Sequence, residues 1–349
     1  MPDSTRPKLQ QQRVTVLGGG SFGTAIANMI AGNGHSTTLW MRNAERARQC
    51  RQQRENSTYL PGYRLDQSLL FSTDLKSALE NADVVFFSVP SKAFRNLARD
   101  AAPFLRPGTS VISTAKGIEG ETFKRMSEIL EEELTQPRVG VISGPNLALE
   151  VVRGELTASV IASADARLCQ QVQELLSTET FRVYANEDVT GVELAGALKN
   201  IYAIAAGIAS ALGFGQNTMA LLVTRSLAEM SRFAGQLGAQ PMTYIGLSGV
   251  GDLFVTCTSP LSRNFRIGLA LGKGRSLEEA LADVGQTAEG VNTTRIIKQK
   301  AEALDIYMPL ANALHEVLFE EATISQAIRK MMLAAQTDDV EFFRPEDAV

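Results

Sequence analysis

The sequence predicts an α/β fold, with a doubly wound, parallel sheet in the N-terminal half and an all-α C-terminal half. Strand-like and helix-like segments alternate through the first half, which is typical of a parallel sheet covered by helices. After about Thr190 the strand-like segments stop, and nearly everything that follows has the apolar spacing of helices. A length of 349 residues exceeds the usual size of one hydrophobic core and favours two domains.

The strands are expected where short runs of β-branched and aromatic residues end in glycine, proline or polar residues. Between them, apolar residues at helical spacing predict the covering helices. The expected strands span residues 13–20, 36–42, 69–73, 82–90, 109–117, 138–145 and 156–163, and the expected helices span residues 21–34, 93–105, 123–134 and 166–176.

Polar residues and a glycine around Asn186 separate the two halves and predict the domain boundary. We therefore expect a flexible tail over residues 1–13, a cofactor-binding domain over residues 14–188 and a helical domain over residues 189–349. The tail is polar and has no apolar signal core, so we expect a cytoplasmic protein.

The composition excludes several classes of function. Acidic and basic residues are interspersed and the net charge is −4, so we expect neither a nucleic acid partner nor membrane insertion. The three cysteines are far apart and odd in number, so the sequence predicts neither a disulfide framework nor a zinc site, and we expect no metal.

A glycine-rich loop, "GGGSFG", follows the first expected strand and opens the first expected helix. Gly18, Gly20 and Gly23 match the G-x-G-x-x-G spacing of dinucleotide-binding loops. In such loops the first glycine permits a tight turn, the second lets the backbone approach a pyrophosphate, and the third lets the helix pack against the strand. The motif therefore predicts a Rossmann-like NAD(P)-binding domain, with the pyrophosphate at the helix N-terminus.

The end of the second expected strand bears on the choice of cofactor. NAD-specific folds usually place a carboxylate there to bind the ribose 2′-hydroxyl, but this strand ends in Arg42. A guanidinium suits a 2′-phosphate, so we expect NADPH/NADP to be preferred and NADH/NAD to be tolerated. The alternative, a solvated surface arginine, stays open at this point.

The segment that begins at Leu194 poses the main question of the sequence. It consists almost entirely of small and apolar residues, and it carries Lys199 and no other charge until Arg225. Small and apolar residues on every side predict a helix that is buried all round, so Lys199 is expected to be buried too. Burying an ammonium is costly unless it is paired or used, which makes Lys199 a candidate catalytic residue.

Further candidates follow a strand end or lie in the helical half. Ligands bind outside the carboxyl ends of strands in such sheets, and Lys116 follows one of these ends. Asp252 follows a Gly-Val-Gly turn, and arginine, serine and asparagine side chains suited to a phosphate come after it. Together these residues predict a pocket for an anionic small molecule around a buried lysine: Lys116, Lys199, Asn200, Asp252, Ser262, Arg263 and Asn264.

With these motifs the chain resembles a known family, the bacterial type of NAD(P)-dependent glycerol-3-phosphate dehydrogenase. The resemblance covers nearly the whole chain, and its most specific parts are "KNIYAIAAGIASALGFGQN" and the pair "GVGDL" and "SRN". It implies reversible reduction of dihydroxyacetone phosphate to sn-glycerol 3-phosphate with NADPH or NADH, supplying glycerophospholipid synthesis. We also expect a homodimer.

The resemblance implies roles for individual residues, with Lys199 as the catalytic proton carrier. The expected substrate contacts are Lys116, Gly144, Asn146, Lys199, Asn200, Asp252, Ser262, Arg263 and Asn264. The expected cofactor contacts are Gly18, Gly20, Ser21, Phe22, Gly23, Arg42, Lys116, Ala148, Arg263, Thr287 and Glu289. The chain departs from the family pattern where Asn146 and Leu147 replace a hydroxyl residue and Phe after "SGP", and where Thr287 replaces an aliphatic residue.

The residue types indicate how the chemistry is divided. The cofactor carries the hydride, so the protein must supply a proton and a grip on the phosphate. Burial is expected to lower the pKa of Lys199, Asp252 is expected to offset this, and Arg263 and Asn264 are expected to hold the phosphate. Two other functions stay open: a reductase resembling ketopantoate reductase, which leaves "SRN" unexplained, and a non-catalytic NADPH sensor, which needs no buried lysine.

Overall fold

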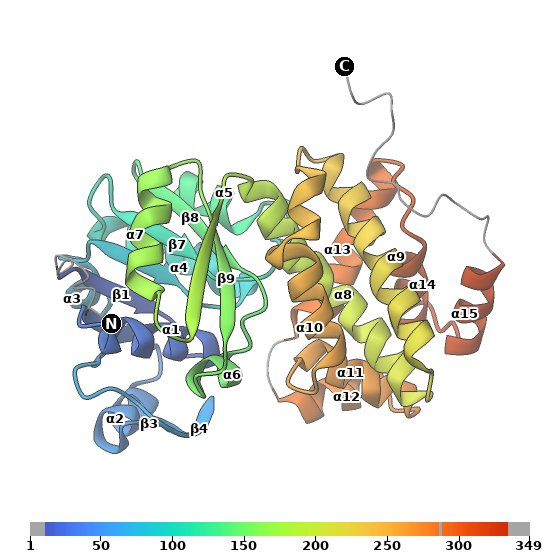
Figure 1. Ribbon diagram of the computed structural model, residues 1–349, viewed down its shortest axis with the longest axis horizontal. Coiled ribbons are helices and arrows are strands. Elements are labelled where there is room, and N and C mark those ends of the chain that lie inside the picture. The colour runs from blue at the N-terminus through green and yellow to red at the C-terminus, as the bar shows by residue number, and fades with distance from the viewer. Residues whose placement is uncertain (1–10, 286–287, 334–349) are drawn as a thin grey trace, which may run out of the picture.

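An α/β region and a helical region lie side by side in the computed structural model of the chain (Figure 1). The structure describes residues 11–285 and 288–333. Most of the tail expected over residues 1–13 lies outside the described residues, and the first strand begins at Arg13. The fold class predicted from the sequence, a doubly wound sheet followed by an all-α half, is confirmed.

The α/β region is built on one sheet of eight strands in the order β10-β9-β8-β7-β6-β1-β2-β5. A separate two-stranded hairpin, β3-β4, follows the second helix. The strands are β1 Arg13–Leu17, β2 Ser36–Trp40, β3 Glu55–Asn56, β4 Leu60–Arg64, β5 Leu70–Ser72, β6 Val84–Phe87, β7 Ser110–Ser113, β8 Arg138–Ser143, β9 Thr157–Ala162 and β10 Phe181–Asn186.

The expectation of a wholly parallel sheet is wrong in one place, because β9 runs antiparallel to β8. A parallel neighbour needs a crossover that returns the chain to the far end of the sheet, usually through a full helix. The connection from β8 to β9 contains only the single-turn helix Ala148–Val152, so β9 runs back along β8 instead. β10, which the sequence analysis did not predict, pairs parallel with β9.

Helices cover both faces of the sheet, and neighbouring residues of β6 show why. Val84 and Phe86 face a hydrophobic cluster with residues of α1 and α7, whereas Val85 and Phe87 face a cluster with residues of α4 and α5. Strands buried on both faces are typical of a doubly wound sheet. The helices of this region are α1 Ser21–Gly32, α2 Ala44–Gln53, α3 Leu75–Leu79, α4 Ser91–Ala101, α5 Met126–Glu133, α6 Ala148–Val152 and α7 Ala166–Leu176, with a 3-10 turn at Ala102–Phe104.

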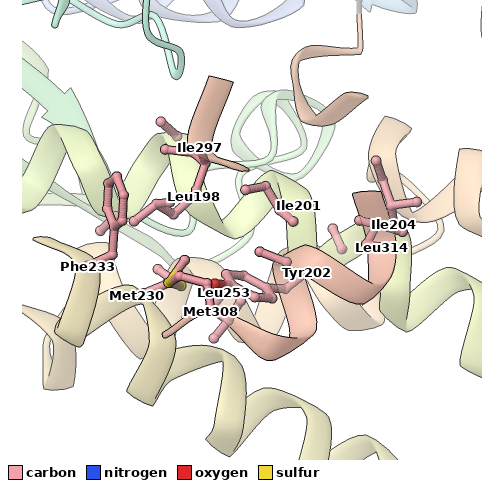
Figure 2. Close-up of a cluster of buried hydrophobic side chains, with 14 of the residues drawn as sticks. Leu198, Ile201, Tyr202, Ile204, Met230, Phe233, Leu253, Ile297, Met308 and Leu314 are labelled. Carbon is pink, nitrogen blue, oxygen red and sulfur yellow. The ribbon is translucent and has the colours of Figure 1, made fainter. Parts of the chain in front are cut away.

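The helical region is assembled around one central helix, α8. Its members are α8 Val189–Ala211, α9 Gln216–Gly235, α10 Asp252–Thr258, α11 Arg263–Gly272, α12 Leu277–Val284, α13 Glu289–Ala303, α14 Pro309–Phe319 and α15 Ile324–Met332. Two short helical turns, Pro241–Ile245 and Leu247–Gly251, precede α10. Side chains of α8, α9, α10, α13 and α14 meet in one hydrophobic cluster (Figure 2).

Helix α8 is buried on all sides, as its composition predicted. It crosses α11 at close range, since a Cβ on Gly207 would lie 2.1 Å from the carbonyl oxygen of Phe265, and one on Gly268 would lie 2.0 Å from that of Ile204. Its length and apolarity alone would suit a membrane span, but 83% of its most apolar window is buried inside the protein. The helix therefore has the burial of a core helix, and Lys199 lies within this core.

Candidate functional site

The strand ends bring several predicted site residues to one edge of the sheet. β1, β2, β6, β7 and β8 run parallel, so their carboxyl ends meet at that edge. The glycine loop follows β1, Arg42 follows β2, Lys116 follows β7 and Gly144 follows β8. In open α/β sheets this edge is where ligands bind.

The three glycines of the loop have different environments. Gly18 has a φ of +123°, and a Cβ there would lie 2.3 Å from the carbonyl oxygen of Ser88, so the turn requires glycine. A Cβ on Gly23 would lie 2.1 Å from the carbonyl oxygen of Gly18, which keeps α1 close to β1. A Cβ on Gly20 would meet nothing within 4 Å. The absence of a side chain at Gly20 thus serves no internal packing and leaves the backbone open to a ligand.

The N-terminus of α1 suits an anion. Gly20 is its N-cap residue, and no side chain caps the helix among the residues that the structure describes. The first N–H groups and the positive end of the helix dipole are therefore available to a phosphate. The Ser21 hydroxyl donates to the carbonyl oxygen of Tyr59 at 3.0 Å, and Phe22 is half-buried. These residues fit the pyrophosphate of a dinucleotide.

Arg42 is exposed and lies close to the glycine loop. The residue before it, Met41, lies directly beside the loop, because a Cβ on Gly19 would be 2.5 Å from the Met41 Cε. A second cation lies nearby: the guanidinium carbon of Arg46 is 4.9 Å from the ring centroid of Tyr59, whose carbonyl binds Ser21. The sequence analysis missed Arg46, although a second arginine only four residues after Arg42 was a usable signal.

Four residues of the helical region and of one strand-end loop form what we call the lysine cluster: Lys116, Lys199, Asp252 and Thr256. Lys199 is 5% exposed and Asp252 is 1% exposed. The Lys199 ammonium donates to Asp252 Oδ1 and, at 2.8 Å, to the Thr256 hydroxyl. An ammonium has three hydrogens, and no acceptor for the third is present among the described residues. Lys199 can therefore donate to a ligand without losing its present partners.

Lys116 is bound from three sides. Its ammonium donates to Asp252 Oδ2 at 2.8 Å and to both the Gly144 carbonyl and Asn146 Oδ1 at 2.9 Å. The Asn146 amide in turn donates to the Ser159 hydroxyl at 2.9 Å. The asparagine that departs from the family pattern thus contacts the lysine cluster. One carboxylate, Asp252, bridges both lysines.

The charge balance of the cluster shifts the titration of Lys199. Burial lowers the pKa of Lys199 well below the usual range of a lysine, the Asp252 carboxylate opposes this shift, and the Lys116 ammonium adds to it. Two ammonium groups share one carboxylate, so the cluster carries excess positive charge when both lysines are protonated. Such a cluster favours an anionic ligand.

A second group of predicted residues lies beside the cluster. Asn264 Nδ2 donates to Asn200 Oδ1 at 2.9 Å, and the Gly290 N–H donates to Asn264 Oδ1 at 3.1 Å. Asn200 Nδ2 is 3.4 Å from the Lys116 carbonyl oxygen, which joins this pair to the loop of Lys116. Ser262 caps α11 by accepting from the Phe265 N–H at 3.2 Å.

Glu289 and Arg263 lie near each other at the start of α13 and α11. The Glu289 carboxylate accepts from the Ser91 N–H at 3.1 Å and from its hydroxyl at 2.7 Å, at the N-terminus of α4. Gly117, next to Lys116, packs against the same contact, since its Cβ would lie 3.2 Å from Glu289 Oε2. The Arg263 side chain is exposed at the surface. Desolvation by the surrounding protein lowers the pKa of Arg263, and the Glu289 carboxylate is the largest influence that raises it. A surface pocket of ≈ 380 Å³ also borders Glu289.

The structure thus gathers the predicted residues in two groups along one edge. Ala148 begins α6 and packs against a small hydrophobic cluster that includes Ala25 of α1. Thr287 lies outside the described residues. Sequence reasoning did not name Thr256, Ser91 or Ser159. Thr256 had a signal, because it lies one helical turn after Asp252, and so did Ser91, because its segment follows the carboxyl end of β6. Among the described residues, no three His, Cys, Asp or Glu side chains are grouped so as to hold a metal ion.

Comparison with known proteins identifies the family. The family model described as NAD-dependent glycerol-3-phosphate dehydrogenase N-terminus matches residues 13–169, and the corresponding C-terminus model matches residues 188–329. A glycerol-3-phosphate dehydrogenase [NAD(P)+] of Saccharophagus degradans is 56% identical over 94% of this chain and 92% of its own length. One of Teredinibacter turnerae is 56% identical over 94% and 97%.

A solved structure agrees with the sequence matches. The crystal structure of glycerol-3-phosphate dehydrogenase from Coxiella burnetii aligns with a TM-score of 0.89 and 37% identity, covering 93% of this chain and 99% of that one. Two family models together cover nearly all of the described sheet and helices, and both bacterial relatives span almost the full chain. The chain therefore belongs to the NAD-dependent glycerol-3-phosphate dehydrogenase family.

Proposed function

We propose that this protein is an NAD(P)-dependent glycerol-3-phosphate dehydrogenase that reversibly reduces dihydroxyacetone phosphate to sn-glycerol 3-phosphate. The observation that carries the chemistry is a lysine buried to 5% exposure, held by a carboxylate and a hydroxyl, with one hydrogen left for a ligand. Its surroundings carry excess positive charge, which suits a phosphorylated ketone. Family membership gives the same reaction through the names of the relatives.

Lys199 is the proposed proton carrier. In the reducing direction its ammonium donates a hydrogen bond to the ketone oxygen, stabilises the developing negative charge and then transfers a proton to it. A nicotinamide cofactor, when bound, would supply the hydride for the carbonyl carbon of that ketone. Asp252 and Thr256 hold the ammonium in place, and Asp252 opposes the lowering of its pKa by burial. In the oxidising direction the neutral amine takes the hydroxyl proton.

The remaining site residues are proposed to bind the two ligands. Arg263 would hold the substrate phosphate in a bidentate contact, with help from Ser262 and Asn264. Four further residues would complete the substrate site: Lys116, Gly144, Asn146 and Asn200. Gly144 and Asn146 accept hydrogen bonds from the Lys116 ammonium, and Asn200 contacts the Lys116 carbonyl oxygen.

The cofactor would lie along the glycine loop. Gly18, Gly20 and Gly23 with Ser21 and Phe22 would hold the pyrophosphate. We propose that Arg42 favours NADPH over NADH, and Arg46 supports this because it adds a second positive charge beside the loop. Ala148, Thr287 and Glu289 remain proposed cofactor contacts, as do Lys116 and Arg263.

Several broader properties belong to the same proposal. Residues 14–188 would form the cofactor domain and residues 189–349 the substrate domain, which agrees with the end of β10 at Asn186 and the start of α8 at Val189. We propose a homodimer, because exposed apolar side chains gather in one segment of the helical region: Met242, Ile245, Val250, Phe254 and Leu261. A cytoplasmic enzyme supplying glycerophospholipid synthesis fits this activity.

A spectrophotometric assay tests the proposed function. Oxidation of NADPH is followed at fixed enzyme with dihydroxyacetone phosphate, with ketopantoate and with no substrate. Oxidation that depends on dihydroxyacetone phosphate alone supports the proposal. Oxidation of NADPH with ketopantoate would indicate the alternative reductase. If NADPH is oxidised with neither dihydroxyacetone phosphate nor ketopantoate, the proposed reaction is refuted.

A further inference from the structure

A second charged side chain is buried on α8, the helix that carries Lys199. Glu193 is 6% exposed and lies six residues before Lys199, which corresponds to roughly 9 Å along the helix axis. It makes none of the contacts described above for the glycine loop or the lysine cluster. A buried carboxylate is costly unless it is hydrogen-bonded, so its partners indicate what it does.

Glu193 binds the start of α5, which belongs to the α/β region. Its Oε1 accepts from the Ser127 N–H at 2.9 Å and its Oε2 from the Ser127 hydroxyl, while Arg125 Nη1 lies 3.5 Å from Oε2. A carboxylate at a helix N-terminus satisfies free N–H groups and complements the helix dipole. Arg125 also donates to the Thr190 hydroxyl at 2.8 Å. One face of α8 thus holds the beginning of α5.

The segment held in this way ends the loop that carries Lys116. Residues 114–125 join β7 to α5, and Ile118 pairs with Arg125 in an antiparallel bridge. Ile118 is 2% exposed within the hydrophobic cluster of the helical region, and the ring of Phe123 lies 6.2 Å from that of Phe233 on α9. The loop is therefore packed against the helical region, although its sequence belongs to the α/β region.

We propose that Glu193 is a positioning residue for Lys116: by holding Arg125 and Ser127, it fixes the Lys116 loop against the helix that carries Lys199. The inference rests on the proposed function, because Lys116 is a proposed substrate contact. Lys116 makes three hydrogen bonds of 2.8 to 2.9 Å, and small movements of its loop would disturb all of them. Losing the carboxylate releases the start of α5 and lets the loop shift.

Glu229 on α9 provides a matched control. It is 2% exposed, and its carboxylate accepts from the Leu310 and Ala311 N–H groups at the start of α14, at 2.6 and 3.2 Å. Burial raises the pKa of Glu193 and of Glu229 alike to about 7. Both residues are buried carboxyls that cap a helix, but Glu229 does so wholly within the helical region. Their substitutions should cost similar stability.

The test compares Glu193→Gln with Glu229→Gln in the full-length enzyme. Glu193→Gln replaces one of the two carboxylate oxygens, each of which accepts one Ser127 hydrogen, by an amide NH2 that cannot accept, and it removes the negative charge that faces Arg125. We therefore expect the KM for dihydroxyacetone phosphate to rise about tenfold. Glu229→Gln should lower the melting temperature similarly but leave this KM within about twofold of wild type. A purely structural defect reduces the active fraction, which lowers kcat and leaves KM unchanged. Ser127→Ala, a smaller change, should raise KM about threefold.

A double-mutant cycle with Lys116→Ala shows whether Glu193 acts through Lys116. In the Lys116→Ala background, Glu193→Gln should change KM by less than about twofold, because the group it positions is gone. Three outcomes would overturn the inference and leave the proposed function standing. These are an unchanged KM in both Glu193→Gln and Ser127→Ala, a rise in KM of the same size in Glu229→Gln, and additive effects of Glu193→Gln and Lys116→Ala on KM. A wild-type enzyme inactive on dihydroxyacetone phosphate would instead refute the proposed function and the inference with it.

Discussion

The glycine loop and the lysine cluster are built in opposite ways. The loop presents backbone and an uncapped helix end to its ligand, and a Cβ on Gly20 would meet no atom within 4 Å. The lysine cluster presents the buried Lys199 and the half-buried Lys116 from distant segments, with the buried Asp252 between them. Backbone recognition costs little stability, whereas desolvating two ammonium groups is expensive. The unfavourable desolvation of charged groups therefore falls at the lysine cluster, where a proton must move.

This contrast implies that the two regions can be damaged separately. A substitution of Lys199 should abolish chemistry and spare cofactor binding, and a substitution in the glycine loop should weaken cofactor binding and spare chemistry. Glu289 of the helical region binds Ser91 at the start of α4, beside the Lys116 loop. Measurements of NADPH affinity and of kcat on the same variants distinguish the two kinds of damage.

The largest effect is expected for Lys199→Ala. Removing the proposed proton carrier should lower kcat by roughly a thousandfold or more, while NADPH affinity measured by fluorescence titration stays close to wild type. The reason is that the lysine acts on the carbonyl and the loop lies in the other region. Should the variant keep more than about a tenth of wild-type kcat, Lys199 would not be the proton carrier.

Arg263 is the next most sensitive position. Arg263→Lys should reduce kcat/KM on dihydroxyacetone phosphate by about a hundredfold, because an ammonium cannot form two parallel bonds to a phosphate. The loss on unphosphorylated dihydroxyacetone should be much smaller, since that substrate never uses the contact. NADPH affinity is measured in parallel, because Arg263 is also a proposed cofactor contact. A preference for the phosphorylated ketone that survives in both Arg263→Lys and Arg263→Ala would place the phosphate elsewhere.

The pH dependence of turnover should report the burial of Lys199. Reduction needs the protonated lysine, and its pKa is lowered, so kcat for reduction should fall as pH rises through that pKa, by about tenfold per pH unit. Oxidation needs the neutral amine and should rise over the same interval. The check is kcat in both directions from pH 6 to about 10. A reduction rate that stays level until the usual lysine pKa of about 10.4 would contradict the burial effect.

The same contrast explains what the sequence could predict. Gly18, Gly20 and Gly23 form a local motif, so the loop and its helix were readable from six consecutive letters. The burial of Lys199 was also predictable, because the small and apolar residues around it leave no polar face on α8. These features depend on residues that are close together in the chain.

Other features depend on contacts that no local pattern encodes. The bridging of Lys116 and Lys199 by Asp252 joins residues 136 and 53 positions apart. The reversal of β9 follows from the short connection after β8, which a strand pattern alone does not reveal. Glu193 has the sequence context of an ordinary charge near a helix start, and only its contact with Ser127 distinguishes it.

Gly20→Ala should separate folding from cofactor binding within the loop. Gly20 has extended backbone angles and no neighbour within 4 Å of its Cβ position, so the substitution should leave the melting temperature nearly unchanged. The added methyl group should block the approach of the pyrophosphate and weaken NADPH binding by about tenfold. Gly23→Ala is the matched comparison, because its Cβ would lie 2.1 Å from the Gly18 carbonyl oxygen and should lower the melting temperature. Wild-type NADPH affinity in Gly20→Ala would show that the ligand does not approach there.

The most selective effect is expected at Arg42, which lies at the exposed margin of the cofactor region. Arg42→Glu removes a partner for the 2′-phosphate and adds a repulsive charge, so the KM for NADPH should rise by about tenfold while that for NADH changes by less than about threefold. The effect is limited because Arg46, four residues further along the chain, keeps a positive charge beside the loop. Added salt should narrow the difference, since exposed charges are screened. Equal changes in the KM values for NADPH and NADH would show that Arg42 is a solvated surface arginine and that other residues set the cofactor preference. The same measurement on Arg46→Glu would then show whether the neighbouring guanidinium binds the 2′-phosphate.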